Sequence, residues 1–120
     1  MYSMSWERPS EALLELLKDN LEGVECEMRK MFGQYAFFMN GNMFCGVHQS
    51  NLFLRLAQED VAEEMSLHPE LKRFEPREGM VMKEYLQTPP EFAENRNSFR
   101  GLLTKSIEYA RRLPPKSEAK

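Results

Sequence analysis

Hydrophobic residues near the start of the chain recur with the period of an α-helix. Four leucines lie at positions i, i+1, i+4 and i+8 and therefore share one helical face: Leu13, Leu14, Leu17 and Leu21. Pro9 is tolerated in a first helical turn, and Gly23 is typical of a helix end. We therefore predict an amphipathic helix over residues 9–21, whose apolar face needs a second layer to cover it.

Between residues 24 and 56 the pattern changes to the period of two that is typical of β-strands. Apolar and polar side chains alternate with a period of about two along residues 24–31, as they do in a half-buried strand. Asn40-Gly41 is a strong hairpin signal, because both residues accept the positive φ angles of a type I′ turn. With a second turn at Gln49-Ser50 and a third at residues 32–34, this region predicts an antiparallel meander of four strands.

Two-residue loops at these hairpins fix a register for the predicted sheet. Ala36 would face Cys45, and Cys45 would face Leu54 on the next strand. One face is then wholly apolar and is expected to form the core, with Ala36, Phe38, Met43, Cys45, Val47, Leu52, Leu54 and Leu56. The opposite face is expected to carry Tyr35, Phe37, Met39, Phe44, Gly46, His48, Phe53 and Arg55.

The second face is rich in aromatic residues, although the solvent side of an antiparallel sheet is normally polar. Three interpretations stay open: a helix of the same chain covers it, it mediates self-association, or it binds a small molecule or another protein. The first and the last helix are both needed over the leucine-rich face, so an intermolecular partner is favoured and we expect a homodimer. The candidate interface residues are Tyr35, Phe37, Phe44, His48, Phe53 and Arg55.

The rest of the chain adds one strand and two helices. Residues 58–67 predict a short helix, 69–79 a surface loop, 80–87 a fifth strand and 98–112 a final helix. The predicted fold is an α+β two-layer sandwich on an antiparallel sheet of about five strands, in the order helix, four-strand meander, helix, strand, helix. We expect a single domain over residues 1–115 and a disordered tail over residues 116–120.

The composition is that of an ordinary soluble domain, with 120 residues of which 42% are hydrophobic and 29% charged. No apolar run reaches the roughly 20 residues of a membrane helix, and the first residues lack the pattern of a signal peptide. We therefore expect a cytoplasmic protein without membrane contact. Cys26 and Cys45 fit a reducing compartment, and the predicted register keeps them too far apart for a disulfide.

The charge is distributed unevenly along the chain. The net charge of −3 argues against sequence-independent binding to phosphate backbones. Residues 96–120 nevertheless hold seven basic residues against two acidic ones. This excess is typical of a solvated helix end, and it also permits an alternative hypothesis of nucleic-acid contact. The residues that would make this contact are Arg100, Lys105, Arg111 and Arg112.

The sequence offers no constellation of residues for catalysis. Its two histidines, His48 and His68, are too few for a zinc site, and no nucleophile elbow, phosphate-binding loop or metalloprotease motif is present. We therefore expect no enzyme activity, no catalytic residue, no metal and no cofactor.

Residues 31–56, which begin Met-Phe-Gly-Gln-Tyr-Ala, resemble the TfoX/Sxy N-terminal-domain family. That family's pattern continues with an apolar strand, an Asp/Asn-Gly turn, a Met-Phe pair and a Leu-Tyr-Leu-Lys-like strand. Residues 83–89 and 106–112 are similar to its later segments, so the resemblance covers roughly residues 12–113. Gln34 and Ala36 depart from the pattern, because the family usually has glycine at both positions.

The resemblance implies a stand-alone domain similar to secretion-chaperone-like α+β sandwiches, with no catalytic residue to transfer. Its motif loop comprises Met31, Phe32, Gly33, Gln34 and Tyr35, which are compatible with either a binding loop or a purely structural turn. The leading hypothesis is a small non-enzymatic regulatory domain that resembles the N-terminal domain of competence regulators and works by protein–protein contact. Direct nucleic-acid contact is the alternative.

Overall fold

One antiparallel sheet of six strands, in the order β1-β2-β3-β4-β6-β5, forms the first of two layers. The computed structural model describes residues 8–31 and 33–116. The strands are β1 (Glu27–Met31), β2 (Gln34–Met39), β3 (Asn42–His48), β4 (Asn51–Arg55), β5 (Lys72–Phe74) and β6 (Met82–Thr88). The helices are α1 (Glu11–Asn20), α2 (Gln58–Leu67), α3 (Pro90–Ala93) and α4 (Arg96–Arg112).

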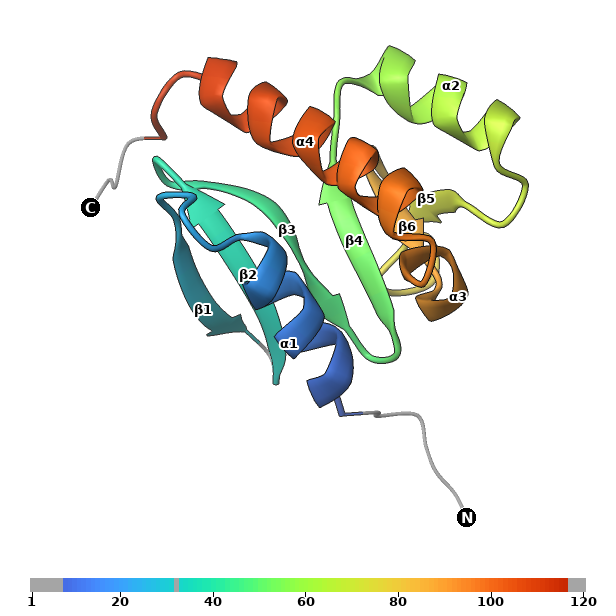
Figure 1. Ribbon diagram of the computed structural model, residues 1–120. Helices are drawn as coiled ribbons and strands as arrows, with labels where there is room; N and C mark the ends of the chain where they lie inside the picture. The colour runs from blue at the N-terminus through green and yellow to red at the C-terminus, as the bar shows by residue number, and fades with distance from the viewer. Residues whose placement is uncertain (1–7, 32, 117–120) are drawn as a thin grey trace.

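The helices form the second layer. Figure 1 shows α1 and α4 lying across the same face of the sheet. All four helices place buried side chains in one core with the sheet, among them Leu17 of α1, Val61 of α2, Phe92 of α3 and Phe99 of α4. The expected α+β two-layer sandwich is therefore confirmed, with six strands in place of about five.

Side-chain caps fix where the two amphipathic helices α1 and α4 begin. The Ser10 hydroxyl accepts a hydrogen bond from the Leu13 N–H (3.2 Å) at the start of α1. The Asn95 side chain accepts one from the Ser98 N–H (3.3 Å) at the start of α4. Both helices bury one apolar face, as the helical period of the sequence predicts.

The sixth strand lies inside the segment predicted to be a loop. β5 pairs with β6, and Arg73 lies opposite Leu86. The loop prediction for residues 69–79 is therefore wrong at residues 72–74. A strand of three residues is too short to show a period of two, and the neighbouring Pro69 and Pro76 favour a loop interpretation.

The β2–β3 hairpin begins as predicted. Asn40 and Gly41 both have positive φ angles (52° and 82°), as a type I′ turn requires. Phe38 lies opposite Met43, which is the predicted pair. The register then shifts, so that Phe37 lies opposite Cys45 and Ala36 opposite Gly46. The predicted pair of Ala36 with Cys45 is wrong, because β3 contains one extra residue, Phe44, in a β-bulge.

The bulge reverses the two faces of β2 relative to the prediction. Phe37, Met39 and Phe44 are buried in the core beneath the helices, whereas the predicted register places them on the opposite face. Ala36, Phe38 and Met43 lie instead in a second cluster with Phe53. We call the side of the sheet that carries this second cluster the outer face.

Two side chains bind the backbone carbonyls at the bulge. The Ser106 hydroxyl of α4 donates to the carbonyl oxygen of Phe44 (3.0 Å), and this hydrogen bond is buried. The Tyr85 hydroxyl of β6 donates to the neighbouring carbonyl oxygen of Met43 (2.8 Å). A β-bulge interrupts the hydrogen bonds of the ladder, so the bulge needs such partners when it is buried.

The end of the described chain packs against the first hairpin. The Lys116 N–H donates to the Asn40 carbonyl oxygen (2.8 Å), and the Asn42 side chain donates to the Pro114 carbonyl oxygen (3.0 Å). Residues 117–120 of the expected tail lie outside the described residues. Among the helices described, none has both the length and the apolar character needed to cross a membrane.

Gly46→Ala is expected to destabilise the fold by about 1–3 kcal/mol, because the new methyl group overpacks the sheet. A Cβ atom at Gly46 would lie 2.3 Å from the Tyr35 carbonyl oxygen and 2.5 Å from the Phe53 ring. Gly101→Ala is the matched control: Gly101 is exposed on α4, and its Cβ would meet no atom within 4 Å. That change should stabilise the protein by about 0.5–1 kcal/mol. Urea unfolding measures both, and a Gly46→Ala protein as stable as the wild type would contradict this packing.

Candidate functional site

A groove of about 600 Å³ lies on the outer face. β1 to β4 and β6 provide part of its lining, and the segment from Phe74 to Met82 provides the rest. Its apolar lining includes four methionines and two phenylalanine rings: Met31, Met43, Met80, Met82, Phe53 and Phe74. Tyr35 also borders the groove, but it packs against the core on the helix side of the sheet. Its polar lining consists of Gln34, His48, Gln49 and Arg77, so among the residues that the structure describes no carboxylate lines the groove.

An aromatic stack forms one part of this groove. The Phe53 and Phe74 rings are stacked, with 4.6 Å between centroids and an interplanar angle of 11°. The His48 ring meets Phe74 edge-on at 5.2 Å. As a result Phe53 is only 4% exposed. A residue of the same chain, Phe74 of β5, therefore covers Phe53, whereas the sequence suggests a helix as the intramolecular cover.

Three of the six predicted interface residues come together here. Tyr35, His48 and Phe53 line the groove, although Phe53 contributes little exposed surface. Phe37 and Phe44 are buried on the helix side of the sheet, so their assignment to an exposed face is wrong.

Arg55 lies apart from the groove lining. Its guanidinium pairs with the Glu84 carboxylate (2.8 Å) and lies 5.4 Å from the centroid of the Tyr85 ring. These contacts hold this arginine against β6, outside the groove.

The sequence interpretation missed Phe74, Arg77 and Met80 as groove residues. These residues belong to the segment read as a loop and to the start of the predicted fifth strand. Met80 is 45% exposed, an uncommon environment for a large apolar side chain. The available signal was the apolar content of residues 80–82 beside the aromatic Phe74.

The motif loop links β1 to β2 along the chain and is hydrogen-bonded to the turn of the β3–β4 hairpin. Gly33 has a φ of 79°, which favours glycine. The Gln34 side-chain oxygen accepts a hydrogen bond from the Gln49 N–H (2.7 Å), and the Ser10 N–H donates to the Gln49 carbonyl oxygen (2.8 Å). The loop is therefore a structural junction, and Met31, Gln34 and Tyr35 also line the groove. Phe32 lies outside the described residues.

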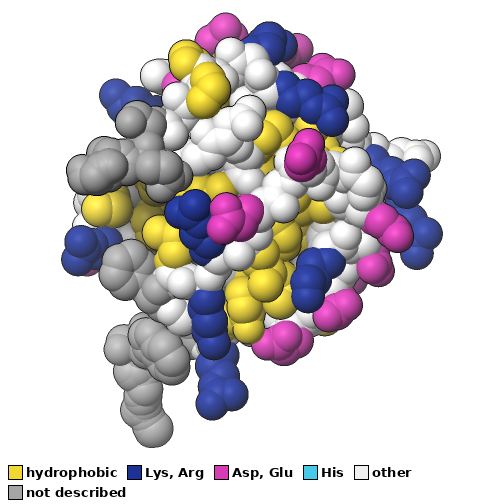
Figure 2. Space-filling model, turned by 90° about the vertical axis from the view of Figure 1, so that its left-hand side faces the viewer, with side chains coloured by type: hydrophobic (Ala, Val, Ile, Leu, Met, Phe, Trp, Pro, Cys, Tyr) yellow, Lys and Arg dark blue, Asp and Glu magenta, His cyan; other side chains and the backbone are white. Residues whose placement is uncertain are grey.

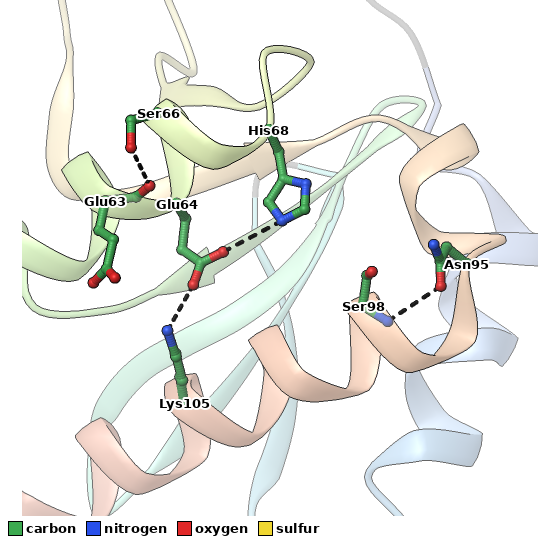
Figure 3. Close-up of polar contacts among 7 residues, drawn as sticks. All are labelled: Glu63, Glu64, Ser66, His68, Asn95, Ser98 and Lys105. Carbon is green, nitrogen blue, oxygen red and sulfur yellow. Dashed lines mark hydrogen bonds and ion pairs between the residues drawn. The ribbon is translucent and has the colours of Figure 1, made fainter.

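The four basic residues of the nucleic-acid hypothesis have different environments on α4. Figure 3 shows Lys105 directed at Glu64 of α2, and its Nζ lies 2.6 Å from the Glu64 Oε2. The hydrogen bond to Glu64 raises the pKa of Lys105. Arg100 donates to the Asn20 side chain (3.2 Å), and the Arg112 guanidinium lies 5.9 Å from the Tyr109 ring centroid. Arg111 lines a separate hollow beside β1.

Neither cysteine resembles an activated nucleophile. Both are free thiols in this structure. Burial raises the pKa of the Cys45 thiol well above its ordinary value and also raises that of Cys26. A raised pKa lowers the fraction of reactive thiolate at neutral pH. In the described part of the chain no three His, Cys, Asp or Glu residues lie close enough to hold a metal ion.

Lys105→Met is expected to lower the free energy of unfolding by about 1–2 kcal/mol, because the buried Glu64 carboxylate would lose its closest cation. The double variant Glu64→Gln/Lys105→Met should regain part of the loss, since it also removes the charge. Arg100→Met removes an exposed cation of the same helix and should change stability by less than about 0.5 kcal/mol. Urea unfolding compares the three. Equal stabilities of Lys105→Met and Arg100→Met would show that the Glu64–Lys105 pair contributes no more than a surface contact.

A comparison with known protein families matches most of this chain to one family. The family model described as the TfoX N-terminal domain matches residues 15–110, a range that includes every strand of the sheet. No curated protein sequence matches the chain. The matched range covers most of the 120 residues and confirms the resemblance carried by residues 31–56. The chain therefore belongs to the TfoX N-terminal domain family.

Proposed function

We propose that this competence-regulator-like domain acts by binding another protein in the outer-face groove, without catalysing a reaction. The groove is the observation that carries the proposal. It joins four methionines to aromatic rings on a surface open to solvent. Methionine side chains are flexible and polarisable, and surfaces rich in them accommodate apolar segments of protein partners.

The charged side chain in the groove lining indicates what kind of protein segment would bind there. Arg77 lines it, and no carboxylate from the described part of the chain does. We expect the bound segment to carry apolar side chains and at least one carboxylate, because complementary charge favours encounter and fixes orientation. A cytoplasmic location is part of the same proposal and suits the two free cysteines.

The nucleic-acid alternative rests on the basic residues of α4. One of its four cations, Lys105, is paired with Glu64, and Arg100 is held by Asn20. The Asn20 amide is neutral and leaves the charge of Arg100 in place, so of these two cations only Lys105 has its charge offset by a carboxylate. The net charge of −3 also opposes binding to phosphate backbones.

A selection from random displayed peptides tests the groove directly. Peptides enriched on the wild-type protein should share apolar residues and an acidic residue, and should bind about tenfold more weakly to Met80→Lys. Val81→Lys is the matched control, because Val81 is the neighbouring residue, is 48% exposed and does not line the groove. Arg77→Glu should weaken binding of the acidic peptides in particular.

Two outcomes would contradict the proposal. Enriched peptides that bind wild type and Met80→Lys equally would place the interaction elsewhere. Binding of a labelled DNA duplex at low salt that Arg111→Ala abolishes and Met80→Lys leaves intact would favour the nucleic-acid alternative.

A further inference from the structure

β1 is an exposed edge of the sheet. Within the described residues it pairs only with β2, and all five of its residues are exposed. Met28 is 40% exposed and Met31 is 37% exposed. Figure 2 views the molecule from the side on which β1 lies in Figure 1, and hydrophobic side chains gather there between charged ones. An edge strand with exposed apolar side chains is a template for pairing with another chain.

The two faces of β1 carry different residues. Met28 pairs with Phe37 of β2 and therefore projects to the helix side of the sheet. Glu27 and Arg29 pair with Phe38 and Ala36 and project to the outer face. Glu27 and Arg29 also contact each other across 3.3 Å, but both are well exposed, so this pair contributes little to the monomer.

A second copy can extend the sheet only in certain registers. Antiparallel pairing of two identical strands places a two-fold axis perpendicular to the sheet, so residues opposite each other must lie on the same face. Centring the axis on Arg29 would set Arg29 opposite Arg29, and centring it on Lys30 would set Lys30 opposite Lys30. Centring it on Glu27 would set Glu27 opposite Glu27. Like charges directly opposite each other destabilise a strand pair.

Centring the axis on Met28 removes every like-charge pair. Met28 then faces Met28 of the second copy, and Glu27 faces Arg29 on both sides of the axis. Cys26 faces Lys30 in the same register. Opposite charges thus meet twice and the exposed methionines cover each other, which is the pattern expected of a self-complementary interface.

We propose that β1 is a homodimer interface, in which two copies pair antiparallel about Met28 and join their sheets into one of twelve strands. The partner is a second copy because the charge pattern of this strand complements itself in a single register. The inference does not depend on the proposed function, since only Met31 of β1 lines the groove. The short overlap predicts a weak, concentration-dependent dimer.

Disulfide trapping tests the register. In a Cys26→Ser background, Met28→Cys should form a covalent dimer on oxidation with diamide, because directly opposed residues of an antiparallel pair lie about 4.5–5.5 Å apart at Cα. Lys30→Cys in the same background is the matched control. Its two copies would be offset by four residues, or roughly 13 Å along the strand, and should stay monomeric. The remaining cysteine, Cys45, is buried in both variants.

Charge reversal tests the interface by a second route that needs no oxidation. Sedimentation equilibrium should show dimerisation weakened on the order of tenfold by Glu27→Arg or by Arg29→Glu, and restored in the double variant. Both residues are exposed, so the fold should tolerate each change. A wild type that stays monomeric at every concentration would overturn the proposal, as would dimerisation that neither single variant affects. Equal trapping of Met28→Cys and Lys30→Cys would overturn the register.

Discussion

Phe44 occupies a β-bulge in β3, and the two carbonyls at this bulge hold three parts of the fold together. Ser106 of α4 binds the Phe44 carbonyl from the helix side, and Tyr85 of β6 binds the Met43 carbonyl. Because side chains alternate along a strand, the extra residue decides which side chains of β2 meet the helices. The core and the outer face both depend on this one shift of register.

The outer face follows from the same constraint. With Phe37 directed to the core, Ala36 and Met43 lie on the outer face beside Phe53. Gly46 leaves room for the Phe53 ring, and Phe74 stacks on it. The chain therefore covers most of its own aromatic surface and leaves a methionine-rich groove, while β1 at the sheet edge stays exposed. We propose partner binding at the groove and self-association at the edge.

Local sequence patterns predict most helices and strands, but they do not predict which face of the sheet the side chains of β2 occupy. The spacing of Leu13, Leu14 and Leu17 predicts α1, and Asn40-Gly41 predicts the first hairpin, because both signals are short-range. The bulge at Phe44 has no such signal, since the residues that stabilise it lie far away in α4 and β6. For this reason the sequence places Phe37 and Phe44 on the wrong face, whereas Tyr35 and His48 line the groove and their interface role stays a prediction.

Cross-strand nuclear Overhauser effects between the backbones of β2 and β3 test the register most directly. The structure predicts contacts between Ala36 and Gly46 and between Phe37 and Cys45, together with the pair of Phe38 and Met43 next to the turn. Contacts between Ala36 and Cys45 and between Phe37 and Phe44 would show a hairpin without the bulge. That result would return Phe37 to the outer face and contradict the account of both surfaces.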